Sequence, residues 1–153
     1  MPVMSTPLLR ATLVAAAMCL AGMAHAEVVK PIKTTRTEVR GAIFKGPNAK
    51  KEPGENGTAA IDAVTSTSRD GAFQTGMYKS GPMREEIAEA PGFPYEEFLY
   101  FLSGSVKLTS SDGSSMIVHA GESVTIPKGW SGVFETKGYT KIYVVYDPAA
   151  VKK

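Results

Sequence analysis

The chain is poor in cysteine and histidine. Its 153 residues contain one cysteine, Cys19, and two histidines, His25 and His119. Cys19 and His25 both fall within the first 26 residues, so a domain without this segment has no disulfide and no thiol nucleophile. With His119 as its only histidine, and no spacing that nominates a serine, it gives no support for a Ser-His-Asp triad.

The chain also lacks a large excess of either positive or negative charge. The sequence has 17 Lys and Arg residues and 15 Asp and Glu residues, which gives a formal net charge of +2. A protein that binds nucleic acid normally carries a basic stripe, and a near-neutral chain gives no support for that class. No glycine cluster opens a helix, so a phosphate-binding loop of the usual kind is also unsupported.

The apolar run over residues 11–23 is too short to span a bilayer comfortably. It follows Arg10 and ends at Ala24–Ala26, which matches an A-x-A cleavage site. This order is typical of a secretory signal peptide over residues 1–26, and Met18 before Cys19 fits a lipoprotein signal poorly. We therefore expect cleavage after Ala26, location in a bacterial periplasm or outside the cell, and no membrane attachment afterwards.

The stretch from Glu97 to Gly132 has the pattern of an antiparallel sheet. Apolar and polar residues alternate with period two, and turn residues interrupt them at short intervals. Asp112 and Gly113, between two such runs, are a strong hairpin signal. The fold class is therefore predicted to be all-β.

Around this stretch we expect an N-terminal arm and loop over 27–60, a β-barrel over 61–148 and a polar tail over 149–153. In the arm, short strands are expected at 28–29 and 39–44, and an exposed loop at 45–58 because proline, glycine and asparagine are frequent there. In the barrel, further strands are expected at 60–65, 72–78, 133–136 and 141–146. Residues 83–96 are expected to form a loop at the barrel mouth, because Pro91 and Pro94 disfavour a helix or a central strand.

Two motifs in the central stretch resemble those of the cupin superfamily. Glu97, six residues and Gly104 resemble the end of the first motif, and Gly121, five residues and the Pro127–Gly132 segment resemble the second. The wider frame resembles the ureidoglycine aminohydrolase-type cupin domain; it runs from Asp70-Gly71-x-Phe73 and Gly76-x-Tyr78 to Lys141-Ile142-Tyr143. This resemblance implies a single jelly-roll barrel and a homodimer, in which outward Phe98, Tyr100 and Leu102 would need covering.

The resemblance also implies a metal held by two histidines and a glutamate of the first motif and one histidine of the second. Glu97 occupies the glutamate position. The histidine positions fall on residues without ligand side chains, which are Pro91 and Phe93 (or Ala90 and Gly92) and Gly132. We therefore predict no cofactor and no standard metal site. A divalent metal at a rebuilt site stays open, with His119 or the mouth glutamates Glu85, Glu86, Glu89 and Glu96 as ligands.

Without a metal, the barrel interior is the candidate site for a small-molecule ligand. Because side chains alternate across a strand, Leu99 and Phe101 should share the inward face of Glu97, and Trp130 and Phe134 that of Gly132. The candidate pocket residues are Tyr78, Tyr95, Glu97, Leu99, Phe101, Trp130, Phe134 and Tyr143. The alternative is that these aromatic residues simply fill the core.

Glu97 separates the possible functions. Burial would disfavour its charged form unless Arg84 or a lysine pairs with it, and such a carboxylate can serve as a general acid or base. It could equally hydrogen-bond to Tyr78 or Tyr143 and do no chemistry. Three functions therefore stay open: a protein that binds a small polar metabolite, an enzyme (a ureidoglycine aminohydrolase-like hydrolase, isomerase or lyase) that uses Glu97, and a non-catalytic periplasmic structural or interaction protein.

Overall fold

The computed structural model describes residues 28–53 and 59–151. The predicted signal peptide, residues 1–26, lies outside the described residues, as do residues 54–58 of the segment predicted as a loop and the last two residues. The chain divides into two units, residues 1–30 and 31–153, and the helix and strands described below all lie in the second. No helix in the described ranges has the length and apolar character needed to cross a membrane.

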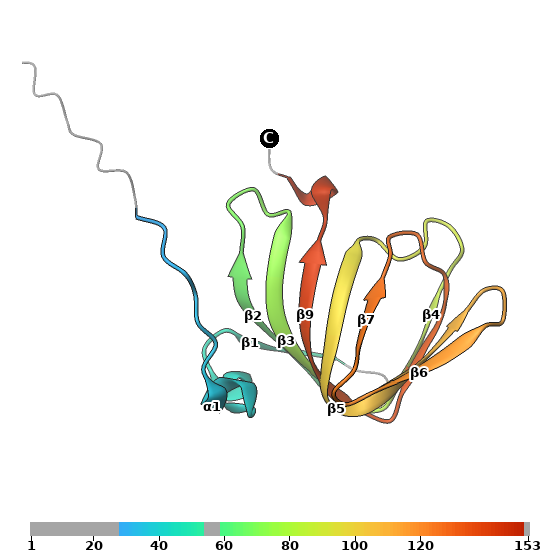
Figure 1. Cartoon of the computed structure of the whole chain (residues 1–153), viewed down its shortest axis with the longest axis horizontal. Coiled ribbons are helices and arrows are strands. Elements are labelled where there is room, and N and C mark those ends of the chain that lie inside the picture. The colour runs from blue at the N-terminus through green and yellow to red at the C-terminus, as the bar shows by residue number, and fades with distance from the viewer. Residues whose placement is uncertain (1–27, 54–58, 152–153) are drawn as a thin grey trace, which may run out of the picture. The chain divides into compact units, whose positions relative to one another are not determined.

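The second unit is a curled antiparallel sheet of nine strands (Figure 1). The order is β1-β2-β3-β9-β5-β8-β4, and β6 and β7 both pair with β5 on its other side. The strands are β1 (Ala49–Glu52), β2 (Ala60–Thr67), β3 (Phe73–Ser80), β4 (Met83–Ile87), β5 (Glu96–Ser110), β6 (Ser115–His119), β7 (Ser123–Ile126), β8 (Gly132–Thr136) and β9 (Tyr139–Tyr146). The prediction of an all-β fold is confirmed.

The long strand β5 belongs to both halves of the curled sheet. Its first half pairs with β9 and β7, and its second half pairs with β8 and β6. The register against β9 shifts between Phe101 and Ser103, and Gly104 follows with a φ of 74°. A side chain at Gly104 would overlap the carbonyl oxygen of Gly138, so the strand turns the corner where only glycine fits.

Alternation along β5 sorts its side chains between the inside and the outside. Glu97, Leu99 and Phe101 are buried, whereas Phe98 and Tyr100 are exposed, as the sequence predicted. The apolar core joins both halves of the sheet. Its buried members are Leu99, Phe101, Val106, Leu108, Val118, Ile126, Phe134, Tyr139 and Tyr143.

The prediction of a strand over residues 39–44 is wrong. The chain forms helix α1 (Arg36–Val39) and the 3₁₀ turn η1 (Ala42–Lys45) there. Thr35 and Glu38 make a capping box that starts the helix, and Gly41 ends it with a φ of 115°. Residues 28 and 29, also predicted as a strand, have no regular structure. These local capping signals outweigh the β propensity of Val39 and Ile43.

Two segments predicted as loops contain strands. Residues 49–52 form β1, which pairs with β2, and residues 83–87 form β4, which pairs with β8. Both are short edge strands rich in charge, a composition that is common at sheet edges and hides the period-two signal. The prolines at 91 and 94 lie beyond the end of β4 and do not prevent its pairing.

The predicted hairpin at Asp112–Gly113 is confirmed, with β5 and β6 as its arms. Its loop is longer than a two-residue turn. The Gly113 N–H donates to the Ser110 carbonyl and Gly113 has a φ of 84°. This pattern fits a turn followed by a left-handed glycine.

Replacing Gly104 with alanine tests the corner. We expect a loss of about 3 kcal/mol or more in the free energy of unfolding, because positive φ and overlap with Gly138 act together. Gly121→Ala is the matched control: it has a φ of 86° but open space around a Cβ, so only the backbone cost of about 1–2 kcal/mol applies. Equal losses for the two variants in urea unfolding would contradict the close approach.

Candidate functional site

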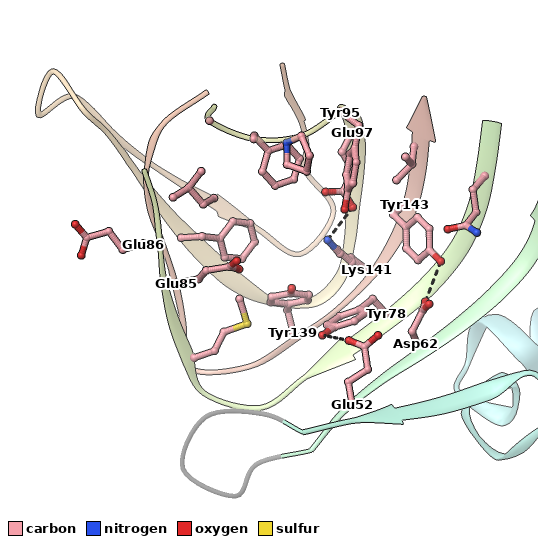
Figure 2. Close-up of a pocket in the computed structure, with 18 residues that line it drawn as sticks. Glu52, Asp62, Tyr78, Glu85, Glu86, Tyr95, Glu97, Tyr139, Lys141 and Tyr143 are labelled. Carbon is pink, nitrogen blue, oxygen red and sulfur yellow. Dashed lines mark hydrogen bonds and ion pairs between the residues drawn. The ribbon is translucent and has the colours of Figure 1, made fainter. Parts of the chain in front are cut away.

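A cavity of about 490 Å³ opens within the curled sheet (Figure 2). Strands β2, β3, β9 and β5 form one wall, and β4 and β8 face them. The loop at 92–95 closes part of the rim. The lining residues are Glu52, Asp62, Gln74, Tyr78, Met83, Glu85, Glu86, Ile87, Gly92, Phe93, Pro94, Tyr95, Glu97, Phe134, Tyr139, Lys141, Tyr143 and Val145.

A buried ion pair lies on the cavity wall. Lys141 of β9 donates from Nζ to Oε1 of Glu97 at 3.1 Å, and both side chains are less than one-tenth exposed. The rings of Tyr78, Phe134 and Tyr139 surround the ammonium, with centroids at 5.5–5.9 Å. The Glu97 carboxylate is therefore paired with a lysine whose ammonium three ring faces also stabilise. Of the alternatives left open for Glu97, the structure therefore has the pairing with a lysine, and not a hydrogen bond from Tyr78 or Tyr143.

Those two tyrosines bond to other carboxylates. The Tyr78 hydroxyl donates to Oε2 of Glu52 at 3.0 Å, and the Tyr143 hydroxyl donates to Oδ1 of Asp62 at 2.8 Å. Burial raises the pKa of both phenols, and these acceptors raise it further. The strand pairing brings the groups together, since Asp62 lies opposite Tyr78 and Gly76 lies opposite Tyr143. Both phenols thus remain neutral donors on the cavity wall.

Tyr139 and Tyr95 complete the aromatic lining. Tyr139 is 5% exposed, and its ring packs edge-on against Phe101 and Phe134. Within the described ranges its hydroxyl makes no hydrogen bond. Burial raises the pKa of Tyr139, and burial together with the charge of Glu97 raises that of Tyr95 to about 12. The Tyr139 hydroxyl is therefore available to a bound molecule.

Strand β4 presents one glutamate to each side. Glu85 lies opposite the buried Phe134, and Glu86 lies opposite Val133. Figure 2 shows Glu85 pointing into the cavity and Glu86 pointing away from it. Glu86 lies 3.8 Å from the exposed Arg84 guanidinium, whereas the Glu85 side chain has no hydrogen bond or ion pair with any described residue. Glu85 is thus a carboxylate free to meet a ligand.

The rim of the cavity is fixed by backbone hydrogen bonds. The Phe93 N–H donates to the Trp130 carbonyl at 2.7 Å, and the Gly129 N–H donates to the Phe93 carbonyl at 2.8 Å. Gly92 packs so closely on Gly129 that a Cβ would overlap its backbone. The loop therefore holds Tyr95 in place although it lacks regular structure.

The structure divides the predicted pocket residues into two groups. Tyr78, Tyr95, Glu97, Phe134 and Tyr143 line the cavity. Three others pack in or against the core and are not among the lining residues. They are Leu99, Phe101 and Trp130. Leu99 and Phe101 are fully buried in the core, and the Trp130 Nε1 donates to the Ser110 hydroxyl at 3.1 Å.

Residues at the expected metal positions do not fit a metal ion. Glu97 already faces an ammonium, which would repel a second cation beside it. A histidine at position 132 is blocked, because a Cβ on Gly132 would overlap the Thr109 carbonyl oxygen. The exposed His119 lies at the end of β6, outside the cavity lining. Across residues 28–53 and 59–151, no three His, Cys, Asp or Glu side chains gather closely enough to hold a metal.

Several lining residues were not among the predicted pocket residues, and four of them matter most for the chemistry of this site. Lys141 and Tyr139 share the inward parity of Tyr143 on β9, a signal that was present in the sequence. Asp62 has the same signal on β2, opposite Tyr78. Glu85 was considered only as part of a loop, and its inward direction follows from the strand that replaces this loop.

Breaking the ion pair should destabilise the fold. We expect Glu97→Gln to lower the free energy of unfolding by about 3 kcal/mol, because the Lys141 ammonium stays buried without its counter-charge. Adding Lys141→Met should recover most of that loss, and urea unfolding of the double-mutant cycle measures the coupling. Glu86→Gln is the control, since its exposed pair with Arg84 should contribute less than about 0.5 kcal/mol. Additive losses at Glu97 and Lys141 would contradict the pairing.

Similar solved structures share this fold at low sequence identity. The Clostridium difficile EutQ protein has a TM-score of 0.50 and 20% identity, with 65% of this chain and 76% of that chain covered. A Rhizobium leguminosarum protein of unknown function has a TM-score of 0.54 and 17% identity, with 78% and 99% covered. A Pseudomonas syringae DUF861 protein of unknown function has a TM-score of 0.56 and 17% identity, with 63% and 43% covered. No curated protein matches the chain.

The family assignment depends on the strands that build the cavity. The model of the EutQ-like cupin domain matches residues 67–143. The match spans half of the chain and includes the Glu97–Lys141 pair. The chain therefore belongs to the EutQ-like cupin family.

Proposed function

We propose that this protein is an exported cupin that binds a small polar metabolite in the barrel cavity without the standard cupin metal. The observation that carries the proposal is the composition of the cavity wall, where carboxylates, phenols and the Gln74 amide alternate with apolar rings. Its volume of about 490 Å³ falls within the usual range for small-molecule sites, roughly 300–1,000 Å³. A barrel filled only for structural reasons would leave no such cavity.

An enzyme is the second candidate. The Glu97–Lys141 pair lies on the cavity wall, so a bound molecule would meet a carboxylate and an ammonium that can exchange a proton. This arrangement supports acid–base chemistry of a hydrolase, isomerase or lyase, including a ureidoglycine aminohydrolase-like reaction. A metal at a non-standard site is the weaker form of this proposal, because the same ammonium opposes it.

Binding can be tested by thermal shift on the mature chain after exhaustive chelation. A panel of small acids, ureides, sugars and amines should contain a compound that raises Tm, because a ligand of the native state stabilises it by mass action. Ile87→Trp, which narrows the cavity from β4, should abolish the shift. Arg84→Trp, on the outward face of the same strand, should keep it.

The same experiment separates the candidates. If the wild type converts the selected compound and Glu97→Gln binds it without converting it, the result supports an enzyme that uses Glu97 over a protein that only binds the compound. If no compound in the panel shifts Tm, the binding function is wrong and a structural role remains. Elemental analysis of the untreated protein completes the test, since stoichiometric metal lost in Glu97→Ala would overturn a metal-free site.

We also propose a homodimer through the outer face of the sheet. Phe73, Phe98, Tyr100 and Tyr146 are each 38–52% exposed on β3, β5 and β9, and the register places Phe73 opposite Tyr146. We refer to these four residues as the outer patch. A second copy would cover it with an identical apolar surface. Leu102, also expected there, is instead half-buried in a groove with Val39 and Phe44 of this chain's own N-terminal segment.

Export and dimerisation can be checked on one preparation. Intact mass of the protein from the periplasm should correspond to a chain beginning at Glu27, and sedimentation should give a dimer. Phe98→Glu with Tyr100→Glu should give a folded monomer. Met116→Glu with Ile117→Glu, both exposed on β6 and outside the outer patch, should leave the dimer intact. A retained N-terminus would contradict export, and a monomeric wild type would contradict the dimer.

A further inference from the structure

The charges around the cavity are strongly unbalanced. Four carboxylates point inward, from Glu52, Asp62, Glu85 and Glu97, and Lys141 is the one basic residue of the lining. With all five groups ionised the inward formal charge is −3. Glu97 neutralises Lys141, so the remaining field comes from Glu52, Asp62 and Glu85. Such a cavity raises the local concentration of cations and disfavours anions.

The cavity wall already holds one ammonium. Lys141 is stabilised there by one carboxylate at 3.1 Å and by three aromatic rings within 6 Å. These contacts combine an ion pair with cation–π attraction, the same chemistry that recognises ammonium ligands. The lining offers a second set of such groups around Glu85.

Two of those groups have no partner among the described residues. Tyr139 is 5% exposed, and its hydroxyl lines the cavity without a hydrogen bond. Glu85 points into the same space without an ion pair. The charge of Glu85 helps to raise the pKa of Tyr78, Tyr95 and Tyr139, because its carboxylate lies close enough to all three phenols to disfavour their ionised forms. The phenols stay protonated and can donate to, or accept from, a bound molecule.

We propose that the metabolite bound in this cavity carries an organic ammonium group, which Glu85 pairs with and the surrounding tyrosine rings cover. This inference rests on the proposed small-molecule function and names its ligand class. The Tyr139 hydroxyl accepts a hydrogen bond from the ammonium or binds a polar group next to it. An amine of a few carbons fits the cavity volume of about 490 Å³.

A metal ion is a poorer occupant of the same field. In the described part of the chain, no three acidic or histidine side chains converge as a metal requires. An organic ammonium is larger, needs fewer ligands and gains from ring faces. The carboxylates around the cavity therefore favour an amine over an inorganic cation.

The test compares matched compounds on the mature protein after chelation. Butyl, benzyl and cyclohexylmethyl compounds are each used as amine, alcohol and carboxylic acid, and Mg²⁺ and Mn²⁺ are tested alone. At least one amine should raise Tm and bind about tenfold or more tightly than its alcohol by calorimetry. Its acid should give no shift. Glu85→Gln should weaken amine binding about tenfold, whereas Glu135→Gln, on the exposed face of β8 and outside the cavity lining, should change it less than about twofold.

Each other outcome overturns the proposal. Acids or alcohols that bind as well as the amines would exclude an ammonium ligand and leave the small-molecule function standing. Equal effects of Glu85→Gln and Glu135→Gln would show that bulk charge, not the cavity, attracts the amine. Stabilisation by Mg²⁺ or Mn²⁺ that depends on Glu85 would indicate a metal site. If no compound of these series or of the wider panel binds, the small-molecule function itself is wrong.

Discussion

The corner in β5 is the constraint on which the rest of the structure depends. One strand of 15 residues joins both halves of the curled sheet, and Gly104 lets its backbone pass against Gly138 at the bend. Because side chains alternate along the strand, the first half directs Glu97 inward above the core residues Leu99 and Phe101. The corner thus sets both the closure of the barrel and the depth of its one buried carboxylate on β5.

The cavity exists because polar groups on its wall satisfy one another. Glu97 has Lys141, Asp62 has Tyr143 and Glu52 has Tyr78. No side-chain nitrogen or oxygen of the described residues that is fully shielded from solvent lacks a hydrogen-bond partner, so the unpaired Tyr139 hydroxyl must be reachable from the cavity. A polar wall of this kind avoids the cost of unpaired buried groups and keeps charges facing the cavity. The groups left over, Glu85 and the Tyr139 hydroxyl, are those that a ligand can reach.

In cupins that carry the metal-binding histidines, this fold holds a metal ion. In this chain, the packing of the backbone leaves no room for one of those histidines. Gly132 packs on Thr109 where the second motif would need a side chain, and the lysine on β9 supplies a cation next to Glu97. The likeness to solved structures of 17–20% identity establishes the fold alone. The ligand must therefore be inferred from the side chains of this chain's own cavity.

The sequence by itself determined the all-β class, the cupin-like motifs and the inward position of Glu97. These features depend on local turns and on period-two alternation, which short segments carry. The charged edge strands β1 and β4 were not predictable, because their pairing with β2 and β8 gives them structure that their composition conceals. Only the tertiary structure decided that Lys141 pairs with Glu97, 44 positions away. Such contacts depend on strand order and register, which bring distant residues together without any local signal.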